Sequence, residues 1–484
     1  MNVTDYLARW GVRTHPFAAE EASKDPLLAP PEPTANATFR HPDFVKIAGD
    51  PSRPGPAIVF GGHGSGKTAL RLQLEAFLKS ESREGERVRT LIVPFDEFNP
   101  LLDKFSRHVR GKTPLETLQH FTLADHLDGL LSTTITTFLD EVLSPADPKA
   151  LNTLTQPQRD ELLLLQAIYD APHVVEQRAA QLRTQLRRFP RSLISTHWLR
   201  RLTAMFWILT IASAAGIAWF GSRTLTMPLW VLFGALPVAT LLTSIPYLNA
   251  SFRIGRTSHL LSRNLRVLDR STDSLRGLLE RLPMRLSLDR SLPRDDSPAS
   301  RFSLLVRLQR LLQSLGYDSI TVLIDRVDEP TLVNGDPERL RAFLAPIFNN
   351  RLMQHTGLAL KLFLPIELKH DLDRASSEYL TEARLDKQHL IAPLAWSGAA
   401  LYDLCESRLH AAGSGLPLAS LLAPELSRRE IELILESQAS PRAALKLMYR
   451  AVQIQSAATE AASHRQTPCP ITRATLDAAR QPAF

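Results

Sequence analysis

Residues 56–78 read Pro-Ala-Ile-Val-Phe-Gly-Gly-His-Gly-Ser-Gly-Lys-Thr-Ala-Leu-Arg-Leu-Gln-Leu-Glu-Ala-Phe-Leu, and this stretch decides the fold class. The apolar run 56–60 predicts a short buried strand, and the apolar spacing of 68–78 predicts a helix. Between them, residues 61–68 match the pattern GxxxxGK[ST] in full, in the strand–turn–helix context that makes this phosphate-binding motif reliable. The stretch therefore predicts an α/β fold of the P-loop NTPase kind, a parallel sheet with helices on both faces.

The motif also assigns chemistry to its residues. Glycines let the backbone curl so that successive N–H groups face a phosphate chain, and the start of the following helix favours negative charge. Lys67 is expected to reach the β and γ phosphates, and the Thr68 hydroxyl is expected to bind Mg²⁺. The nucleotide-binding residues predicted from the motif are Gly61, Gly64, Ser65, Gly66, Lys67 and Thr68.

A second apolar run supplies the carboxylate that a Mg²⁺–nucleotide site needs. Residues 321–324 read Thr-Val-Leu-Ile and predict a buried strand that ends at Asp325, which we assign to the metal. Asp328 and Glu329 follow closely, and either can position or deprotonate the water that attacks the γ phosphate. The sequence leaves open which of these two acids acts.

Two later stretches bear on the same site. Residues 358–365 predict another strand, placed where a P-loop sheet carries a γ-phosphate sensor, although no polar sensor ends it. Ser440-Pro441-Arg442 opens a C-terminal helix, and Arg442 is a candidate phosphate ligand because guanidinium groups match phosphate geometry. No guanine-reading NKxD motif follows the acidic strand. The expected ligands are therefore ATP and Mg²⁺.

The composition of the chain argues against several classes of protein. With 484 residues the chain is long enough for several structural units, and its net charge of +7 is a mild excess. Cys405 and Cys469 form no CxxC pair, which indicates neither a disulfide framework nor a zinc site. The first thirty residues lack a basic segment followed by an apolar one, so we expect no cleaved export signal. Nucleic acid binding is not indicated, since no basic–aromatic interleaving occurs.

Two uncharged apolar segments predict a membrane hairpin. Residues 202–220 comprise 19 residues and residues 227–248 comprise 22, without a single charge in either. As helices they would extend about 28 and 33 Å, enough to cross a hydrocarbon core of about 30 Å. The alternative is a hydrophobic helical hairpin buried in a soluble core. Because neither span contains an acidic or basic side chain, an anchor is favoured over a transporter.

The flanks of the hairpin predict its orientation. Residues 182–201 and 249–268 carry only basic charges, whereas the connecting loop 221–226 contains Arg223 alone. Basic residues accumulate on the cytoplasmic side of spanning helices, which places both flanks, and with them both termini, on the cytoplasmic side of the inner membrane. The flanking arginines are Arg183, Arg187, Arg188, Arg191, Arg200, Arg201, Arg253, Arg256, Arg263 and Arg266. Small residues in the first span, such as Ala212 and Gly216, favour self-association.

These features together resemble a known family. The P-loop at 61–68, the acidic strand end at 325–329, the Ser-Pro-Arg helix start at 440–442 and the hairpin between the first two are similar to the KAP family of membrane-associated P-loop NTPases, within the STAND and AAA+ assemblage. Arg326 stands where that family more often has a second acid. The resemblance implies an ATP-driven switch that acts with protein partners at the membrane, in signalling, defence or assembly.

The expected organisation therefore has the hairpin inserted in the nucleotide domain. We expect an irregular N-terminal arm (1–50), the first part of the NTPase core (51–100), a helical insertion (101–200), the hairpin (201–249), a return helix and linker (250–300), the second part of the core (301–399) and a C-terminal helical lid (400–484). The expected function is an ATPase switch that is anchored to membrane lipid through residues 202–248, forms a homo-oligomer and binds an unknown protein partner. The alternative is a nucleotide-binding scaffold with little turnover.

Overall fold

The computed structural model describes residues 2–19, 21–28, 39–50, 53–83, 89–109, 111–143, 150–186, 196–220, 227–289, 291–374, 390–391, 393–461 and 469–481. The chain divides into two units. Unit 1 comprises residues 1–96, 319–341 and 348–484, and unit 2 comprises residues 97–318 and 342–347. Unit 2 is thus inserted in sequence between two strands of unit 1.

Unit 1 is built on a parallel five-stranded sheet in the order β2-β3-β4-β1-β5. The strands are β1 (Ala57–Gly61), β2 (Thr90–Phe95), β3 (Ser319–Ile324), β4 (Leu358–Pro365) and β5 (Leu390–Ile391). β1, β3 and β4 are mostly apolar, with Ser319 and Thr321 in β3 and Lys361 in β4 as exceptions, and they are buried along their whole length, as parallel strands are when both faces are covered. The expectation of an α/β fold with a parallel sheet is confirmed, and the sheet is compatible with a P-loop fold.

The helices of unit 1 surround the sheet and form a C-terminal cluster. They are α1 (Val3–Ala8), η1 (Ala22–Lys24), α2 (Phe44–Ala48), α3 (Lys67–Arg83), α14 (Pro337–Leu344, which runs into unit 2), α15 (Asn350–Met353), α16 (Ile366–Arg374), α18 (Gly398–Ala411), α19 (Leu418–Leu421), α20 (Arg428–Glu436), α21 (Pro441–Ala461) and α22 (Arg473–Arg480). α3 packs on the sheet through Leu70 and Leu74, which share a core with Val59 and Phe363.

The N-terminal segment that we expected to be irregular contains α1, η1 and α2. Tyr6 and Leu7 of α1 are buried in the C-terminal helical cluster, together with Leu401 of α18 and Met448 of α21. The Tyr6 hydroxyl donates to the carbonyl of Cys469 at 2.8 Å. The start of the chain is therefore part of the core of the C-terminal helices, a long-range packing that local sequence patterns do not indicate.

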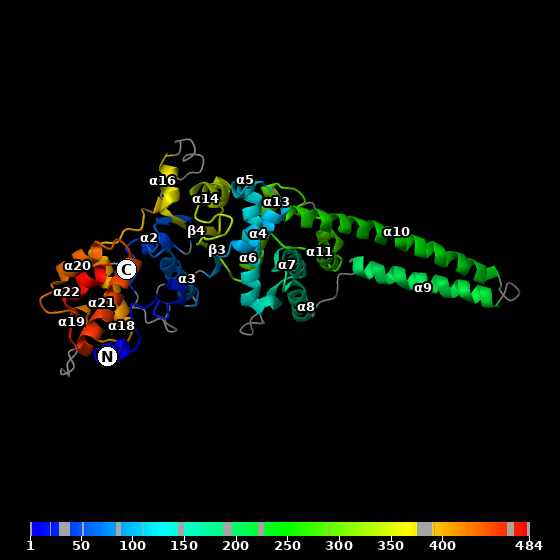
Figure 1. The fold of residues 1–484 in the computed structure, drawn as a ribbon. Coiled ribbons are helices and arrows are strands. Elements are labelled where there is room, and N and C mark those ends of the chain that lie inside the picture. The colour runs from blue at the N-terminus through cyan, green and yellow to red at the C-terminus, as the bar shows by residue number, and fades with distance from the viewer. Residues whose placement is uncertain are drawn as a thin grey trace. The chain divides into compact units, whose positions relative to one another are not determined.

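Unit 2 is helical in the part of it that the structure describes. Its helices are α4 (Asn99–His108), α5 (Pro114–Gln119), α6 (Leu123–Leu143), η2 (Ala150–Thr153), α7 (Gln156–Tyr169), α8 (Val175–Gln185), α9 (Thr196–Phe220), α10 (Met227–Asn264), α11 (Thr272–Leu279), α12 (Met284–Ser287), α13 (Pro298–Ser314) and η3 (Ala345–Ile347). Figure 1 shows α9 and α10 side by side as a hairpin. Thr210 of α9 and Thr240 of α10 join them by a hydroxyl–hydroxyl hydrogen bond of 2.7 Å.

The predicted membrane hairpin corresponds to α9 and α10. Within the described residues, no helix combines the length and the apolar character needed to cross a membrane. The expected loop 221–226, the flanking Arg187, Arg188 and Arg191, and the side chains of most of residues 213–237 lie outside the described residues. α10 continues without a break to Asn264, so the expected boundary at residue 249 falls inside one helix.

Candidate functional site

The P-loop follows β1 at the carboxyl edge of the sheet. β1 ends at Gly61, and α3 begins at Lys67. Gly64 and Gly66 have φ values of 75° and 91°, a left-handed conformation that side chains with a Cβ atom disfavour. The motif's glycines are thus where this turn needs them, and the loop opens onto the start of α3, as a phosphate site requires.

The Lys67 side chain curls back over the loop. Its ammonium group donates to the carbonyls of Gly61 at 2.6 Å and Gly62 at 3.1 Å. Burial lowers the pKa of Lys67, while the carboxylates of Asp328, Asp325 and Glu367 act in the opposite direction. Lys67 thus lies within the electrostatic reach of the acidic strand end, as the sequence predicts for a shared site.

Asp325 lies directly after β3 and is buried. Burial raises its pKa, whereas a hydrogen bond from the Thr68 side chain and the charge of Arg71 lower it. The atom Oδ2 has no hydrogen-bond partner in the described structure, and Arg71 Nε lies 3.6 Å from it. A buried carboxylate oxygen without a partner, beside a threonine hydroxyl, fits the oxygen ligands that Mg²⁺ prefers. Thr68 and Asp325 are therefore together, as predicted.

Arg71 was not singled out from the sequence, although it binds the same carboxylate group from α3. Its guanidinium contacts Glu75 at 3.2 Å and Asp96, just after β2, at 3.0 Å. Arg71 is buried. Three carboxylates from three parts of unit 1 thus surround one cation. Its position one helical turn beyond Thr68 was the available signal.

Asp328 and Glu329 lie in the turn after Asp325. Both line the cavity beside the P-loop, and Asp328 is half-buried. The Glu329 side chain is 63 % exposed, with its carboxylate 3.8 Å from Arg326 Nε. Partial burial raises the pKa of Glu329, and Arg326 opposes this. Arg326 itself has a φ of 56°, an uncommon value for a residue with a side chain.

Arg442 lies against the P-loop at the start of α21. Its backbone N–H donates to the carbonyl of Gly64 at 3.3 Å, and its side chain lines the cavity. A Cβ atom added to Gly64 would lie 2.8 Å from Cβ of Arg442, so only glycine allows this approach. The sequence made Arg442 a candidate phosphate ligand, and the structure places the start of its helix against the P-loop.

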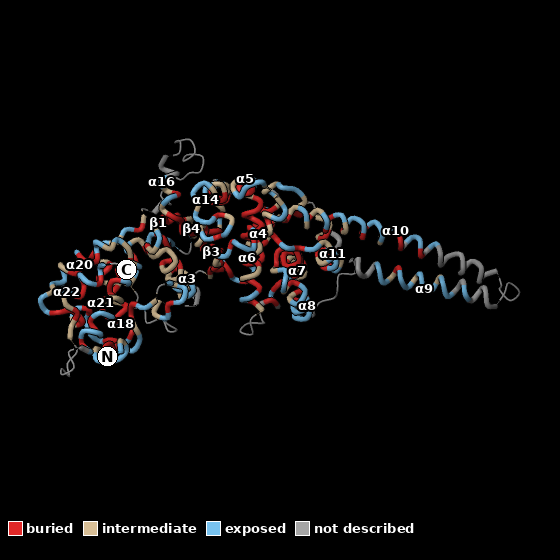
Figure 2. The backbone as a smooth tube through the Cα atoms, viewed as in Figure 1, coloured by how far each residue is buried: buried red, intermediate tan, exposed pale blue. Residues whose placement is uncertain are grey.

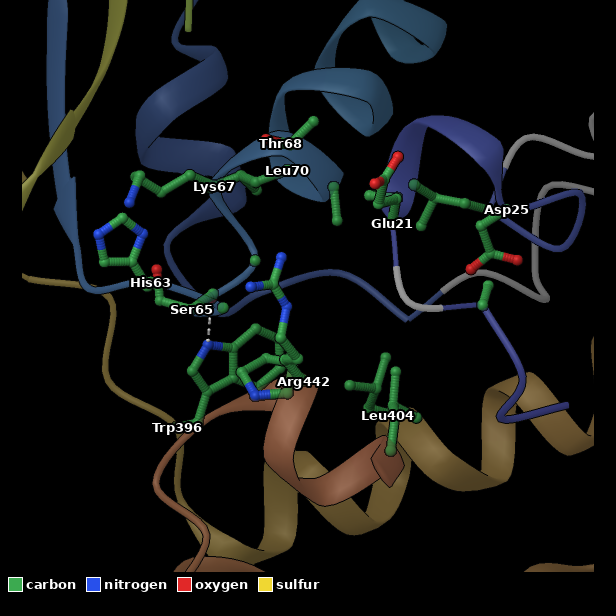
Figure 3. Close-up of a pocket in the computed structure, with 18 of the residues that line it drawn as sticks. Glu21, Asp25, His63, Ser65, Lys67, Thr68, Leu70, Trp396, Leu404 and Arg442 are labelled. Carbon is green, nitrogen blue, oxygen red and sulfur yellow. Dashed lines mark hydrogen bonds between the residues drawn. The ribbon is translucent and has the colours of Figure 1, made fainter. Parts of the chain in front are cut away.

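Trp396 is a site residue that the sequence analysis missed. Its indole N–H donates to the carbonyl of Ser65 at 2.8 Å (Figure 3). The ring also contacts Phe39 and His41, with ring centroids 5.9 and 5.0 Å away. Trp396 directly precedes Ser397, the N-cap of α18. A tryptophan between the last strand and the next helix was the only signal, and it does not indicate a P-loop contact.

These residues surround a cavity of about 530 Å³. Figure 3 shows Lys67, Thr68, Trp396 and Arg442 around it, with Glu21 and Asp25 of the N-terminal segment on another side. The volume is within the range of small-molecule and cofactor sites. The N-terminal segment is fixed there by an ion pair between Asp25 and Arg408 of α18. The predicted arm thus forms part of the cavity wall, which its sequence does not indicate.

Comparisons with models of protein families, with curated proteins and with solved structures find no match.

Proposed function

We propose that this chain is an ATP-binding P-loop NTPase that acts as an ATP-dependent switch. One observation carries the proposal. Lys67 and Thr68 of the P-loop, Asp325 after β3 and Arg442 of α21 all line one cavity at the carboxyl edge of a parallel sheet. Ligands of open α/β sheets bind at this edge, and a lysine, a hydroxyl, a carboxylate and an arginine are what a Mg²⁺–triphosphate requires.

Hydrolysis to ADP and phosphate follows from the same residues. The cavity places Asp328 and Glu329 near the end of the P-loop, where either acid can accept a proton from the attacking water. The oxygen of that water forms a bond to the γ phosphorus as the bond to the β–γ bridging oxygen breaks. Thr68 and Asp325 would hold Mg²⁺, which would supply positive charge against the phosphates. Lys67 and Arg442 stabilise the charge on the phosphate oxygens.

A second function, a nucleotide-binding scaffold with little turnover, is favoured by one observation. Glu329 is mostly exposed and its carboxylate lies 3.8 Å from Arg326 Nε, so it must leave this ion pair to act on a water beside the P-loop. An acid that must change position before it can act on water gives slow hydrolysis.

An ATP-binding and hydrolysis assay on the detergent-solubilised full chain tests both functions. Lys67→Ala is expected to abolish tight ATP binding. Asp328→Asn and Glu329→Gln are expected to retain binding, and the one that carries the water-activating acid loses turnover by about 100-fold or more. Wild-type protein that binds ATP without turnover would favour the scaffold. Wild-type protein that does not bind ATP would contradict both.

We further propose that α9 and α10 anchor the protein to the cytoplasmic membrane, as the resemblance to the KAP family implies. The supporting observation is a set of exposed apolar side chains on the described part of the hairpin. Figure 2 shows exposed residues along the described parts of α9 and α10. The set consists of Met205, Trp207, Ile208, Leu209, Ile211, Val238, Leu241, Leu242, Ile245, Leu248 and Phe252. Exposed apolar surface of this extent marks a contact with lipid or with another protein.

A topology experiment tests the anchor. A reporter inserted within residues 221–226 is expected to report the exterior, and a reporter at the C-terminus is expected to report the cytoplasm. Both reporters on the cytoplasmic side would contradict a spanning hairpin. The same preparation, sized with and without ATP, tests the proposed homo-oligomer and the coupling of nucleotide to assembly. The protein partner and the pathway, in signalling, defence or assembly, follow from the resemblance alone.

A further inference from the structure

Two carbonyl groups at the tip of the P-loop are held from outside by the C-terminal part of unit 1. The Ser65 carbonyl accepts the indole N–H of Trp396 at 2.8 Å, and the Gly64 carbonyl accepts the backbone N–H of Arg442 at 3.3 Å. Trp396 leads into α18, and Arg442 starts α21. The loop that would hold phosphate therefore depends on the C-terminal helices for part of its hydrogen bonding.

Because the peptide group is planar, the hydrogen bond from Trp396 to the Ser65 carbonyl also sets the direction of the Gly66 N–H group. The described chain contains no cis peptide bond, so the carbonyl of Ser65 and the N–H of Gly66 point in opposite directions across one planar group. With the carbonyl held toward Trp396, the Gly66 N–H is directed away from the indole. Gly66 lines the cavity, and inward N–H groups are what a phosphate-binding loop uses.

The indole is itself fixed in place. A Cβ atom built on Gly66 would lie 3.5 Å from Cζ2 of Trp396 and 3.7 Å from Cγ of Pro441, so the loop packs directly on both residues. On another side, the ring contacts Phe39 and His41 of the N-terminal segment. His41 Nε2 lies 3.2 Å from the carbonyl of Ala395, the residue before Trp396. The donor is thus held by two distant parts of the chain before any ligand arrives.

We propose that Trp396 is a positioning residue that holds the Ser65–Gly66 peptide in the phosphate-binding orientation and thereby couples docking of the C-terminal helices to affinity for the phosphate chain. The inference rests on the proposed nucleotide function and names its regulation. Coupling of this kind is reciprocal. Docked helices raise affinity for the triphosphate, and bound triphosphate stabilises the docked helices by the same factor.

The test separates this role from contact with the nucleobase. Affinities of the full chain for Mg²⁺–ATP and for inorganic triphosphate with Mg²⁺ are measured by calorimetry for wild type, W396F and W10F. Phenylalanine keeps an aromatic ring beside Phe39 and His41 but lacks the N–H donor. W396F is expected to weaken both ligands by the same factor of about five, the effect of losing one neutral hydrogen bond. Trp10, half-buried against the C-terminal helices and outside the cavity wall, supplies the matched control.

The other outcomes overturn the proposal in distinguishable ways. If W396F weakens ATP but not triphosphate, the ring acts on the base and not on the loop. If W396F changes neither affinity while Lys67→Ala abolishes the binding of both ligands, the proposed nucleotide function is supported and the positioning role of Trp396 is contradicted. If the wild type binds neither ligand, both the proposed nucleotide function and the positioning role are contradicted. The melting temperature without ligand is measured in parallel, and should W396F fold poorly, W396L gives the same comparison, because leucine also lacks a side-chain donor.

Discussion

Arg71 supplies the positive charge between three carboxylates of the candidate site. It is buried, and its three side-chain nitrogens face Glu75, Asp96 and Asp325 at 3.0–3.6 Å. Three carboxylates this close repel one another unless a cation lies between them. Arg71 therefore offsets the repulsion among these carboxylates, and its loss leaves them without a cationic partner.

Arg71→Met is expected to lower the free energy of unfolding by about 3 kcal/mol, because removing one partner of a buried ion pair leaves the other unpaired. Urea denaturation followed by circular dichroism measures the change. Arg341→Met, at an exposed arginine of α14, is the control and is expected to change stability by less than about 0.5 kcal/mol. Equal stability of the two variants would show that the carboxylates are neutralised in another way.

Lys361 is a buried cation in the middle of β4. Its ammonium donates to the carbonyls of Ile47 at 2.7 Å and Ala48 at 3.1 Å, at the end of α2. Burial lowers its pKa from 10.5 to about 8. Between about pH 8 and 10.5 the unfolded chain therefore binds the proton that the folded chain has released, and stability contributed by this site rises with pH.

Lys361→Met removes this titration. The free energy of unfolding of the wild type, relative to that of Lys361→Met, is expected to rise by up to about 3 kcal/mol from pH 8 to pH 10.5. Taking this difference removes the contribution that the other lysines make to the pH dependence of both proteins. Urea denaturation of both proteins at four pH values across this window gives the result. A difference that stays constant with pH would mean that Lys361 titrates at its ordinary pKa when folded.

The residues of the site differ in how far the sequence could predict them. Lys67, Thr68 and Asp325 follow from a motif and from an apolar run that ends in an acid, because each is fixed by its own strand. Arg71, Trp396 and Lys361 acquire their contacts from segments 25 to more than 300 residues away. No local pattern encodes such pairings, since they depend on strand order and on where the C-terminal helices pack.

At the scale of elements, the strands were the most predictable. The expected run at Leu358–Pro365 is confirmed as β4 with the same bounds, and the expected run at 321–324 lies within β3. β5 was not predicted, because it has only two residues and takes its strand geometry from pairing with Ile58 and Val59 of β1. The register of a short strand is set by its neighbour and not by its own periodicity.

A buried ion pair joins three helices of unit 2. Arg301 of α13 binds Asp128 of α6 at 3.1 Å, and the Tyr169 hydroxyl of α7 donates to the same carboxylate at 2.8 Å. All three side chains are fully buried. Arg301 also donates to backbone carbonyls, including that of Ser297 at the start of its own helix. The network fixes how these helices pack, since an apolar core alone tolerates sliding.

Arg301→Met is expected to lower the free energy of unfolding by about 3–5 kcal/mol, because the buried carboxyl of Asp128 loses its cationic partner. The double variant Asp128→Asn/Arg301→Met is expected to lose less than the sum of the two single variants, by at least about 1 kcal/mol. Chemical denaturation of the four proteins gives the cycle. Additive losses would mean that Arg301 is held mainly by its carbonyl partners and not by Asp128.

At the scale of the whole molecule, the insertion of unit 2 separates the two halves of the candidate site in sequence, although both halves belong to unit 1. Residues 61–68 and Asp325 lie more than 250 positions apart, yet all belong to unit 1. The hairpin α9–α10 belongs entirely to unit 2. The proposed membrane attachment and the proposed nucleotide binding therefore rest on different residues, and a deletion can test them separately.

The pairing of α9 with α10 defines which residues a deletion of the hairpin should remove. Thr210 bonds Thr240 across the antiparallel pair, and with equal rise in both helices this register places residue 201 opposite residue 249. Packed helices lie about 8–10 Å apart, a gap that four residues of Gly-Ser-Gly-Ser span.

Replacing residues 202–248 with this linker is expected to release the protein from vesicles in a flotation assay. The affinity for ATP, measured by calorimetry, is expected to change by less than about two-fold. Continued flotation would place the attachment elsewhere in the chain. Loss of ATP binding by a variant that still folds, by circular dichroism, would mean that the hairpin is needed to form the nucleotide site.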